Sequence, residues 1–262
     1  MDYDFQFNTA DLIIVASVAT GMPFFYCYNF SSVSEALKRS YHQKYPGEKG
    51  TIRHFLYTRT LGFFLLGLLP VGIFLYLIPS WDLHSLGLTF KTNTAFISLK
   101  YIGAVGLMMV TPMLFLASKS ETYNHYPQIR IDEWDGSLIW RYNFALLLYF
   151  IGQEMLFRGL LLFPLASSMR VWPTIVINTA LYSFTNLAKG SAETLTAILL
   201  GPILCLITLQ TQSIWAAVSI QSILAMSKCM IALKYNPALT VVKKRIPVAH
   251  SECCMGCEHC RS

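Results

Sequence analysis

Long apolar stretches constrain the fold of this chain more than any other feature of its sequence. A helix that crosses the hydrocarbon core of a bilayer needs about 20 mostly apolar residues, at a rise of about 1.5 Å each. The chain is 54% hydrophobic and only 13% charged, far below the roughly 25% charged residues of soluble domains. Candidate spans lie at about 11–28, 55–78, 98–118, 138–165, 172–189, 192–209 and 214–234. The sequence therefore predicts an all-α, polytopic transmembrane helical bundle of about seven spans.

The spans divide the chain into two parts. Residues 1–235 are predicted to form a transmembrane domain, and residues 236–262 a basic, cysteine-rich tail that begins at Asn236-Pro237, a pair that ends a helix. Residues 1–10 contain no Lys or Arg, whereas a removable signal peptide begins with a basic region. We therefore expect the first span to be retained.

The basic residues of the loops predict the orientation, because Lys and Arg next to spans stay preferentially in the cytoplasm. If the N-terminus is outside, the cytoplasmic segments hold most of the loop cations, and the outer segments hold only Lys91 and Arg170. The prediction is an N-terminus outside and a C-terminus in the cytoplasm. The formal net charge of +6 then indicates contact with anionic membrane lipids and gives no support to nucleic-acid binding.

One predicted span contains charged residues. Its segment 152–159 reads Gly-Gln-Glu-Met-Leu-Phe-Arg-Gly, which places Glu154 and Arg158 four residues apart and on one face of a helix. Ionisable groups inside a membrane usually face the interior of a bundle, pair with each other and mark a functional site. These two residues are therefore the first candidates for a site.

The polar segment and two later ones resemble the CPBP family, which includes CAAX-processing endopeptidases and bacteriocin-processing, Abi-type proteins. The family's first motif, Glu-Glu-x-x-x-Arg with Phe before and Gly after the Arg, is similar to segment 153–159. Its second, Phe-x-x-x-His, is similar to 182–186, and its third, Ser-(Leu/Ile)-Trp-Ala leading to His-x-x-x-Asn, to 213–216 and 221–225. The resemblance covers about 138–235, with the order and spacing of the motifs kept, and implies a CPBP-like core.

The resemblance also implies roles for four positions at which this chain differs. In the family the first Glu activates a water, the two His polarise the carbonyl, stabilise the oxyanion or surround a metal, and the Asn assists. The matching positions here are Gln153, Asn186, Gln221 and Ala225. A carboxamide has no basic lone pair near neutral pH, and it is a poor metal ligand beside imidazole, although it can donate to an oxyanion.

Three interpretations of the retained pair stay open. Glu154 is a displaced general base, offset by about 100° from position 153 on a helix. Alternatively, Glu154 and Arg158 form a structural ion pair, with Gln153, Asn186 and Gln221 hydrogen-bonding between helices. In the third interpretation the same groups line a pocket that binds a ligand or peptide without chemistry.

The cysteines fall into two groups. Cys27, Cys205 and Cys229 lie inside predicted spans and are expected to be small buried residues. In the tail, Cys254-x-x-Cys257-x-x-Cys260 has a spacing typical of zinc or iron–sulfur ligation. Palmitoylation beside a basic run and the absence of any specific role are the alternatives, and a reducing cytoplasm disfavours a disulfide framework.

The sequence thus leads to three hypotheses. The first is a catalytically degenerate pseudoprotease that acts as a scaffold, chaperone or accessory subunit for another membrane protein or a hydrophobic peptide segment. The second is an active intramembrane endopeptidase of the CAAX-processing type that uses Glu154. The third is a subunit whose cysteine tail holds a metal or cluster; no other cofactor is predicted.

Overall fold

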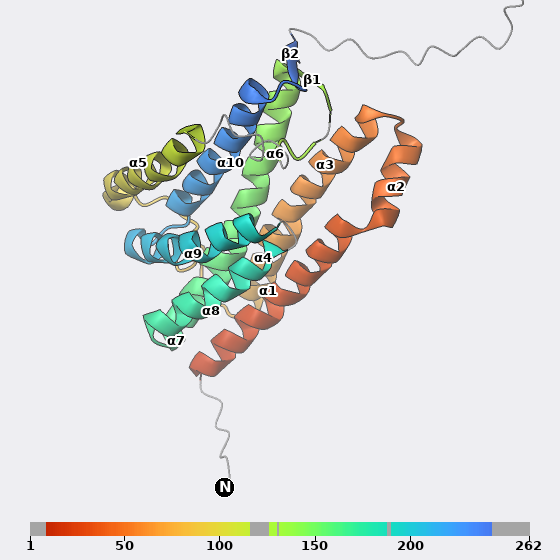
Figure 1. Ribbon diagram of the computed structural model, residues 1–262. Coiled ribbons are helices and arrows are strands. Elements are labelled where there is room, and N and C mark those ends of the chain that lie inside the picture. The colour runs from red at the N-terminus through yellow and green to blue at the C-terminus, as the bar shows by residue number, and fades with distance from the viewer. Residues whose placement is uncertain (1–8, 116–125, 130, 188–189, 243–262) are drawn as a thin grey trace, which may run out of the picture.

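The chain is a bundle of helices in the computed structural model, which describes residues 9–115, 126–129, 131–187 and 190–242 (Figure 1). The elements are α1 (Thr9–Val33), α2 (Glu35–Lys44), α3 (Glu48–Gly62), η1 (Phe63–Leu68), α4 (Leu69–Leu77), α5 (Thr92–Phe115), β1 (Glu133–Asp135), α6 (Gly136–Glu154), η3 (Met155–Leu162), α7 (Phe163–Ser168), α8 (Val171–Phe184), α9 (Ser191–Thr211), α10 (Trp215–Tyr235) and β2 (Thr240–Val242). The prediction of an all-α membrane bundle is confirmed.

Six helical segments of the described chain are long and apolar enough to cross a membrane. They are Thr9–Ser31, Glu48–Leu77, Thr92–Phe115, Gly136–Ser168, Glu193–Thr211 and Trp215–Tyr235. The segment expected to span at 172–189 differs, because its helix α8 has only 14 residues and so reaches about 21 Å. A hydrocarbon core of about 30 Å is longer than this helix.

The span with the polar segment lies at the centre of the bundle. In the most apolar 18-residue window of the Gly136–Ser168 span, 78% of the residues are buried. In the corresponding window of α5, 6% are buried. Figure 1 shows α5 on the outside, next to α10, while α6 runs between α10 and α3. The polar segment is therefore enclosed by protein, as the cost of placing charges in lipid requires.

Two of the spans contain a π-helical segment, and the two spans approach each other closely where α6 packs against η1. The π-helical segment η1 interrupts the α3–α4 span, and η3 begins directly after Glu154. A Cβ added to Gly152 would lie 2.7 Å from the Cα of Phe63 and 2.8 Å from the carbonyl oxygen of Gly62. The close approach of the two backbones thus requires glycine at position 152.

A short parallel strand pair joins the start of α6 to the segment after α10. Glu133, Trp134 and Asp135 of β1 pair with Thr240, Val241 and Val242 of β2. The Trp134 side chain is fully buried beside this pair, and Asp135 caps α6 by accepting a hydrogen bond from the backbone N–H of Leu138 at 2.6 Å. The first residues after the last span are thereby held against the bundle (Figure 1).

Of the three cysteines in the predicted spans, two are buried and one is exposed. Cys205 and Cys229 are buried as expected. The expectation was wrong for Cys27, which is exposed on α1. The helix α1 is close to uniformly apolar, so the sequence pattern alone does not distinguish its inner face from its outer face.

Candidate functional site

Glu154 and Arg158 meet in the centre of the bundle. The two side chains are fully buried, and Arg158 Nη1 donates to Glu154 Oε1 at 3.1 Å. The pair links the last residue of α6 to the π-helical segment η3. The four-residue spacing in the sequence thus corresponds to an ion pair in the structure.

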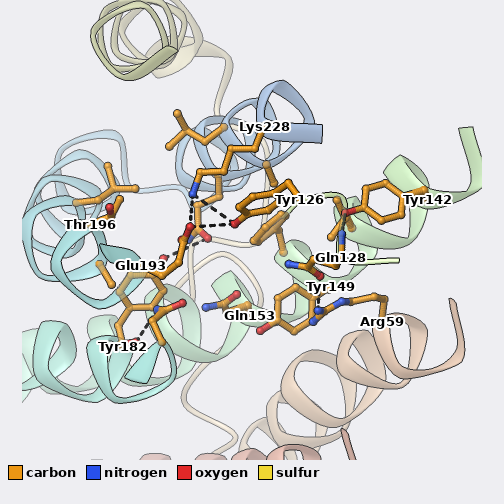
Figure 2. A pocket seen from close by; sticks show the side chains of 18 residues that line it. Arg59, Tyr126, Gln128, Tyr142, Tyr149, Gln153, Tyr182, Glu193, Thr196 and Lys228 are labelled. Atoms are coloured by element: carbon orange, nitrogen blue, oxygen red, sulfur yellow. Dashed lines mark hydrogen bonds and ion pairs between the residues drawn. The ribbon is translucent and has the colours of Figure 1, made fainter. Parts of the chain in front are cut away.

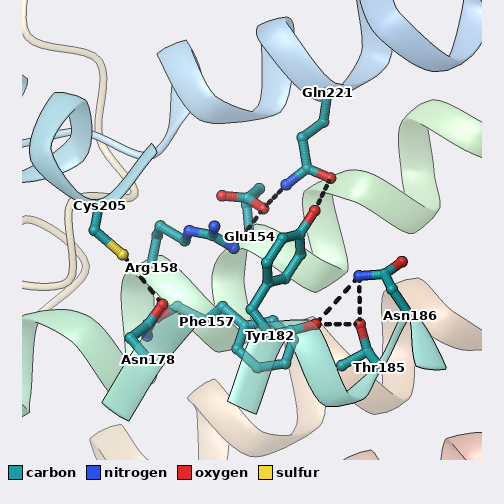
Figure 3. A network of polar contacts seen from close by, with 9 residues as sticks. All are labelled: Glu154, Phe157, Arg158, Asn178, Tyr182, Thr185, Asn186, Cys205 and Gln221. Atoms are coloured by element: carbon teal, nitrogen blue, oxygen red, sulfur yellow. Dashed lines mark hydrogen bonds and ion pairs between the residues drawn. The ribbon is translucent and has the colours of Figure 1, made fainter. Parts of the chain in front are cut away.

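A neighbouring helix also contacts this carboxylate. Gln221 of α10 donates from Nε2 to the same Oε1 atom of Glu154, and Tyr182 of α8 donates from its hydroxyl to Gln221 Oε1 at 3.4 Å (Figure 3). The guanidinium carbon of Arg158 lies 4.4 Å from the centre of the Tyr182 ring, an attractive contact between a cation and an aromatic face. Three helices are therefore joined around one buried carboxylate.

A second polar contact joins α8 to η3. Asn178 of α8 donates from Nδ2 to the carbonyl oxygen of Phe157 at 2.6 Å, and it accepts from the Cys205 thiol at 3.3 Å (Figure 3). Sequence reasoning missed Asn178 and treated Cys205 only as a small buried residue. An Asn within an apolar span, 20 residues after a charged motif, was the signal that the sequence contained.

The four positions at which the chain differs from the family motifs all line one pocket. Gln153, Asn186, Gln221 and Ala225 come from α6, from the turn after α8 and from α10, and all four line one pocket with a cavity volume of about 80 Å³. Figure 2 shows this pocket with Gln153 labelled. Glu154 and Arg158 are not among its lining residues. The pocket is thus lined at these positions by three carboxamides and a methyl group, and the ion pair lies behind it.

Two of the carboxamides are fixed by neighbours. Gln221 is held by Glu154 and Tyr182 as described, and Asn186 Nδ2 donates to the Tyr182 carbonyl at 3.2 Å and to the Thr185 hydroxyl at 3.1 Å. The side chain of Gln153 is only 2% exposed, and its Oε1 has no hydrogen-bond partner among the described residues. The Gln153 oxygen is therefore placed to accept a hydrogen bond from a bound molecule.

A charged cluster that sequence reasoning missed lies on another wall of the pocket. Lys228 Nζ lies 2.7 Å from Glu193 Oε1, and the Tyr126 hydroxyl donates to the same oxygen at 3.0 Å (Figure 2). Burial and the Glu193 carboxylate raise the pKa of the Tyr126 hydroxyl far above its usual range, so Tyr126 stays protonated and donates. These residues are 35 to 102 positions apart, and only the fold brings them together.

The donor set of the pocket does not fit a metal ion. Carboxamides replace both imidazoles, and the described residues contain no group of three His, Cys, Asp or Glu side chains arranged to hold one. The residues of this pocket therefore do not supply the ligands that a metal-dependent step would need. The predicted ligands Cys254, Cys257 and Cys260 lie outside the described residues, and the zinc or iron–sulfur site of the tail stays a prediction that elemental analysis of the purified protein would test.

Comparison with known proteins identifies one related family. Residues 135–226 match the family model of type II CAAX prenyl endopeptidases, Rce1-like. The match begins at the last residue of β1 and ends within α10, and so includes all four motif positions that line the pocket. No curated protein and no solved structure matches the chain significantly.

Proposed function

Since residues 135–226 are an Rce1-like segment of the CPBP family of membrane proteins, we propose that this chain is a non-catalytic relative of the family's endopeptidases. It binds a hydrophobic segment of another membrane protein in the pocket of the former active site. Its role is that of a scaffold, chaperone or accessory subunit. The observation that carries the proposal is the division between Gln153, which lines the pocket, and Glu154, which does not.

Proton transfer requires a base that reaches the water it activates. Gln153 is in the right place but has no basic lone pair. Glu154 is basic but is fully buried, and one of its oxygens is bound by both Arg158 and Gln221. Its other oxygen, Oε2, has no hydrogen-bond partner among the described residues, but it is buried and Glu154 does not line the pocket. To reach a water in the pocket the side chain would have to turn away from Arg158, which would leave that charge buried without its counter-ion.

The lining that remains suits binding. Carboxamides and hydroxyls of the pocket donate and accept hydrogen bonds, and they match the amide groups of a peptide segment. Leu146, Phe150, Leu200 and Leu224 supply an apolar wall. The pocket thus combines polar groups held in place by their neighbours with an apolar wall, a combination that ligand sites use.

A cleavage assay tests the absence of chemistry. In proteoliposomes with a prenylated CAAX peptide, the wild-type chain is expected to release no more product than the Glu154→Gln variant. Gln153→Glu is also expected to be inactive, because the two imidazole positions still hold carboxamides. Cleavage by the wild type that Glu154→Gln abolishes would overturn the proposal in favour of an active endopeptidase.

Filling the pocket tests the binding role. Ala225 lines the pocket, and Ala225→Phe is expected to reduce at least tenfold the yield of a partner crosslinked in native membranes. The matched control is Ala104→Phe on the exposed face of α5, which should retain the partner. Equal capture by the two variants would place the partner outside the pocket.

The orientation belongs to the same proposal. The N-terminus lies outside and the C-terminus in the cytoplasm, supported by the cations of segment 30–54 and of the tail. This arrangement needs an odd number of crossings, one more than the six apolar segments found in the described part of the chain. Labelling Cys257 or Cys260 only from the outside would contradict it.

A further inference from the structure

The pocket contains one more positive than negative side chain. Its charged lining residues among those described are Arg59, Lys228 and Glu193. Lys228 and Glu193 form the ion pair at 2.7 Å, whereas no carboxylate of the described residues lies within ion-pair distance of Arg59. The pocket therefore has a net charge of about +1 at neutral pH.

Arg59 is held in place by neutral groups alone. Its Nη1 donates to the Tyr28 hydroxyl at 3.4 Å and its Nη2 to Gln128 Oε1 at 2.6 Å. The guanidinium carbon lies 4.7 Å from the centre of the Tyr149 ring and 5.2 Å from that of Phe55. These contacts fix the position of the guanidinium without neutralising its charge, and its buried Nε–H has no acceptor among the described residues.

A cation in this environment favours an anionic ligand. Charged groups within a membrane protein are usually paired, and the planar guanidinium binds carboxylate and phosphate groups through parallel hydrogen bonds. Near Arg59, the Tyr142 oxygen accepts from the backbone N–H of Gln128 at 3.3 Å, which leaves its own O–H as a further donor. The apolar wall of Leu146 and Phe150 continues from this end of the pocket along the same helix.

We propose that the pocket binds a monoanionic amphiphile, with its carboxylate or phosphodiester group at Arg59 and its hydrocarbon chain along the apolar wall. One negative charge balances the one unpaired cation. Contact between the chain of such a molecule and the apolar side chains removes apolar surface from water, which a small hydrated anion cannot do. The inference shares its pocket with the proposed function, but it is tested by ligand binding, whereas the proposed function is tested by cleavage and partner capture.

The first arm of the test compares ligands on the wild-type protein. Thermal unfolding is followed in a neutral detergent with oleate, phosphatidylglycerol, methyl oleate or acetate at equal concentration. Oleate and phosphatidylglycerol are expected to raise the midpoint, because each combines one charge with a hydrocarbon chain. Stabilisation by methyl oleate equal to that by oleate would overturn the role of the charge, and stabilisation by acetate equal to that by oleate would overturn the role of the chain.

The second arm assigns the charge to Arg59. Arg59→Gln is expected to weaken oleate binding about tenfold or more, since a charge-assisted contact is replaced by a neutral one. Arg141→Gln is the matched control, because Arg141 is exposed on α6 and does not line the pocket. Oleate affinity that is unchanged in Arg59→Gln, or reduced equally in both variants, would contradict the proposal. If Arg59→Gln fails to fold, the comparison of oleate with its methyl ester on the wild type still decides.

Discussion

Arg158→Met is expected to destabilise the folded bundle by about 3–5 kcal/mol, as is typical when one partner of a buried ion pair is removed. The substitution keeps most of the side-chain volume but leaves the Glu154 carboxylate with Gln221 alone, in a site without solvent access. It also removes the contact between the guanidinium and the Tyr182 ring. Unfolding in mixed micelles, followed by tryptophan fluorescence, measures the loss.

Two controls separate this effect from a general loss of charge. Lys38→Met removes a cation from an exposed pair, 3.9 Å from Glu35, and should leave the unfolding midpoint unchanged, because such pairs contribute little. The double variant Glu154→Gln with Arg158→Met should recover part of the loss, because no unpaired charge is left. A single variant as stable as the wild type would show that the pair does not hold the helices together.

Gly152→Ala is expected to reduce stability by about 3 kcal/mol, at the upper end of the range for overpacked sites. The added Cβ would overlap the Phe63 Cα and the Gly62 carbonyl oxygen. These are backbone atoms of the neighbouring span, and they cannot move aside as a side chain does. The displaced helix carries Gln153 and Glu154, so we also expect weaker ligand binding in the pocket.

The matched control is Gly103→Ala, where an added Cβ meets nothing within 4 Å. This variant should be neutral or slightly more stable, because alanine is the better helix former by about 0.5–1 kcal/mol. The unfolding midpoints of the two variants are compared under the same conditions. Equal stabilities would contradict the close helix crossing at Gly152.

The sequence was sufficient to predict the bundle because membrane spans leave a signal that depends on composition and length alone. Because the spans are apolar on all sides, the sequence does not indicate which face of each helix packs against its neighbours. Cys27 was assigned to the interior although it is exposed, since α1 has apolar residues on every side. The apolar run at 172–189 was predicted to be one span, whereas its helix ends at Phe184.

From the sequence, the motif positions could be named, but the charged residues that line the same pocket could not. The motif order indicated that Gln153, Asn186 and Gln221 belong together, and the structure places all three on one pocket. Arg59 and Glu193 lie outside the motifs, and their contacts join segments far apart in the sequence, such as Arg59 with Gln128. No local pattern indicates such contacts. The π-helical segment η3 was likewise not predicted, and the position of Glu154 behind the pocket is visible only in the structure.

The strand pair β1–β2 has a consequence for the evolution of the fold. Parallel strands require a crossover connection, and here the crossover is the whole of α6 to α10, so the core enters and leaves the bundle at adjacent strands. The segment from β1 to β2 therefore begins and ends at neighbouring strands, so that its chain path is a nearly closed ring. A circular permutation that joins the end of β2 to the start of β1 would therefore keep the order of α6 to α10, whereas α3, which supplies Arg59 to the pocket and contacts Gly152, would have to dock from outside that ring.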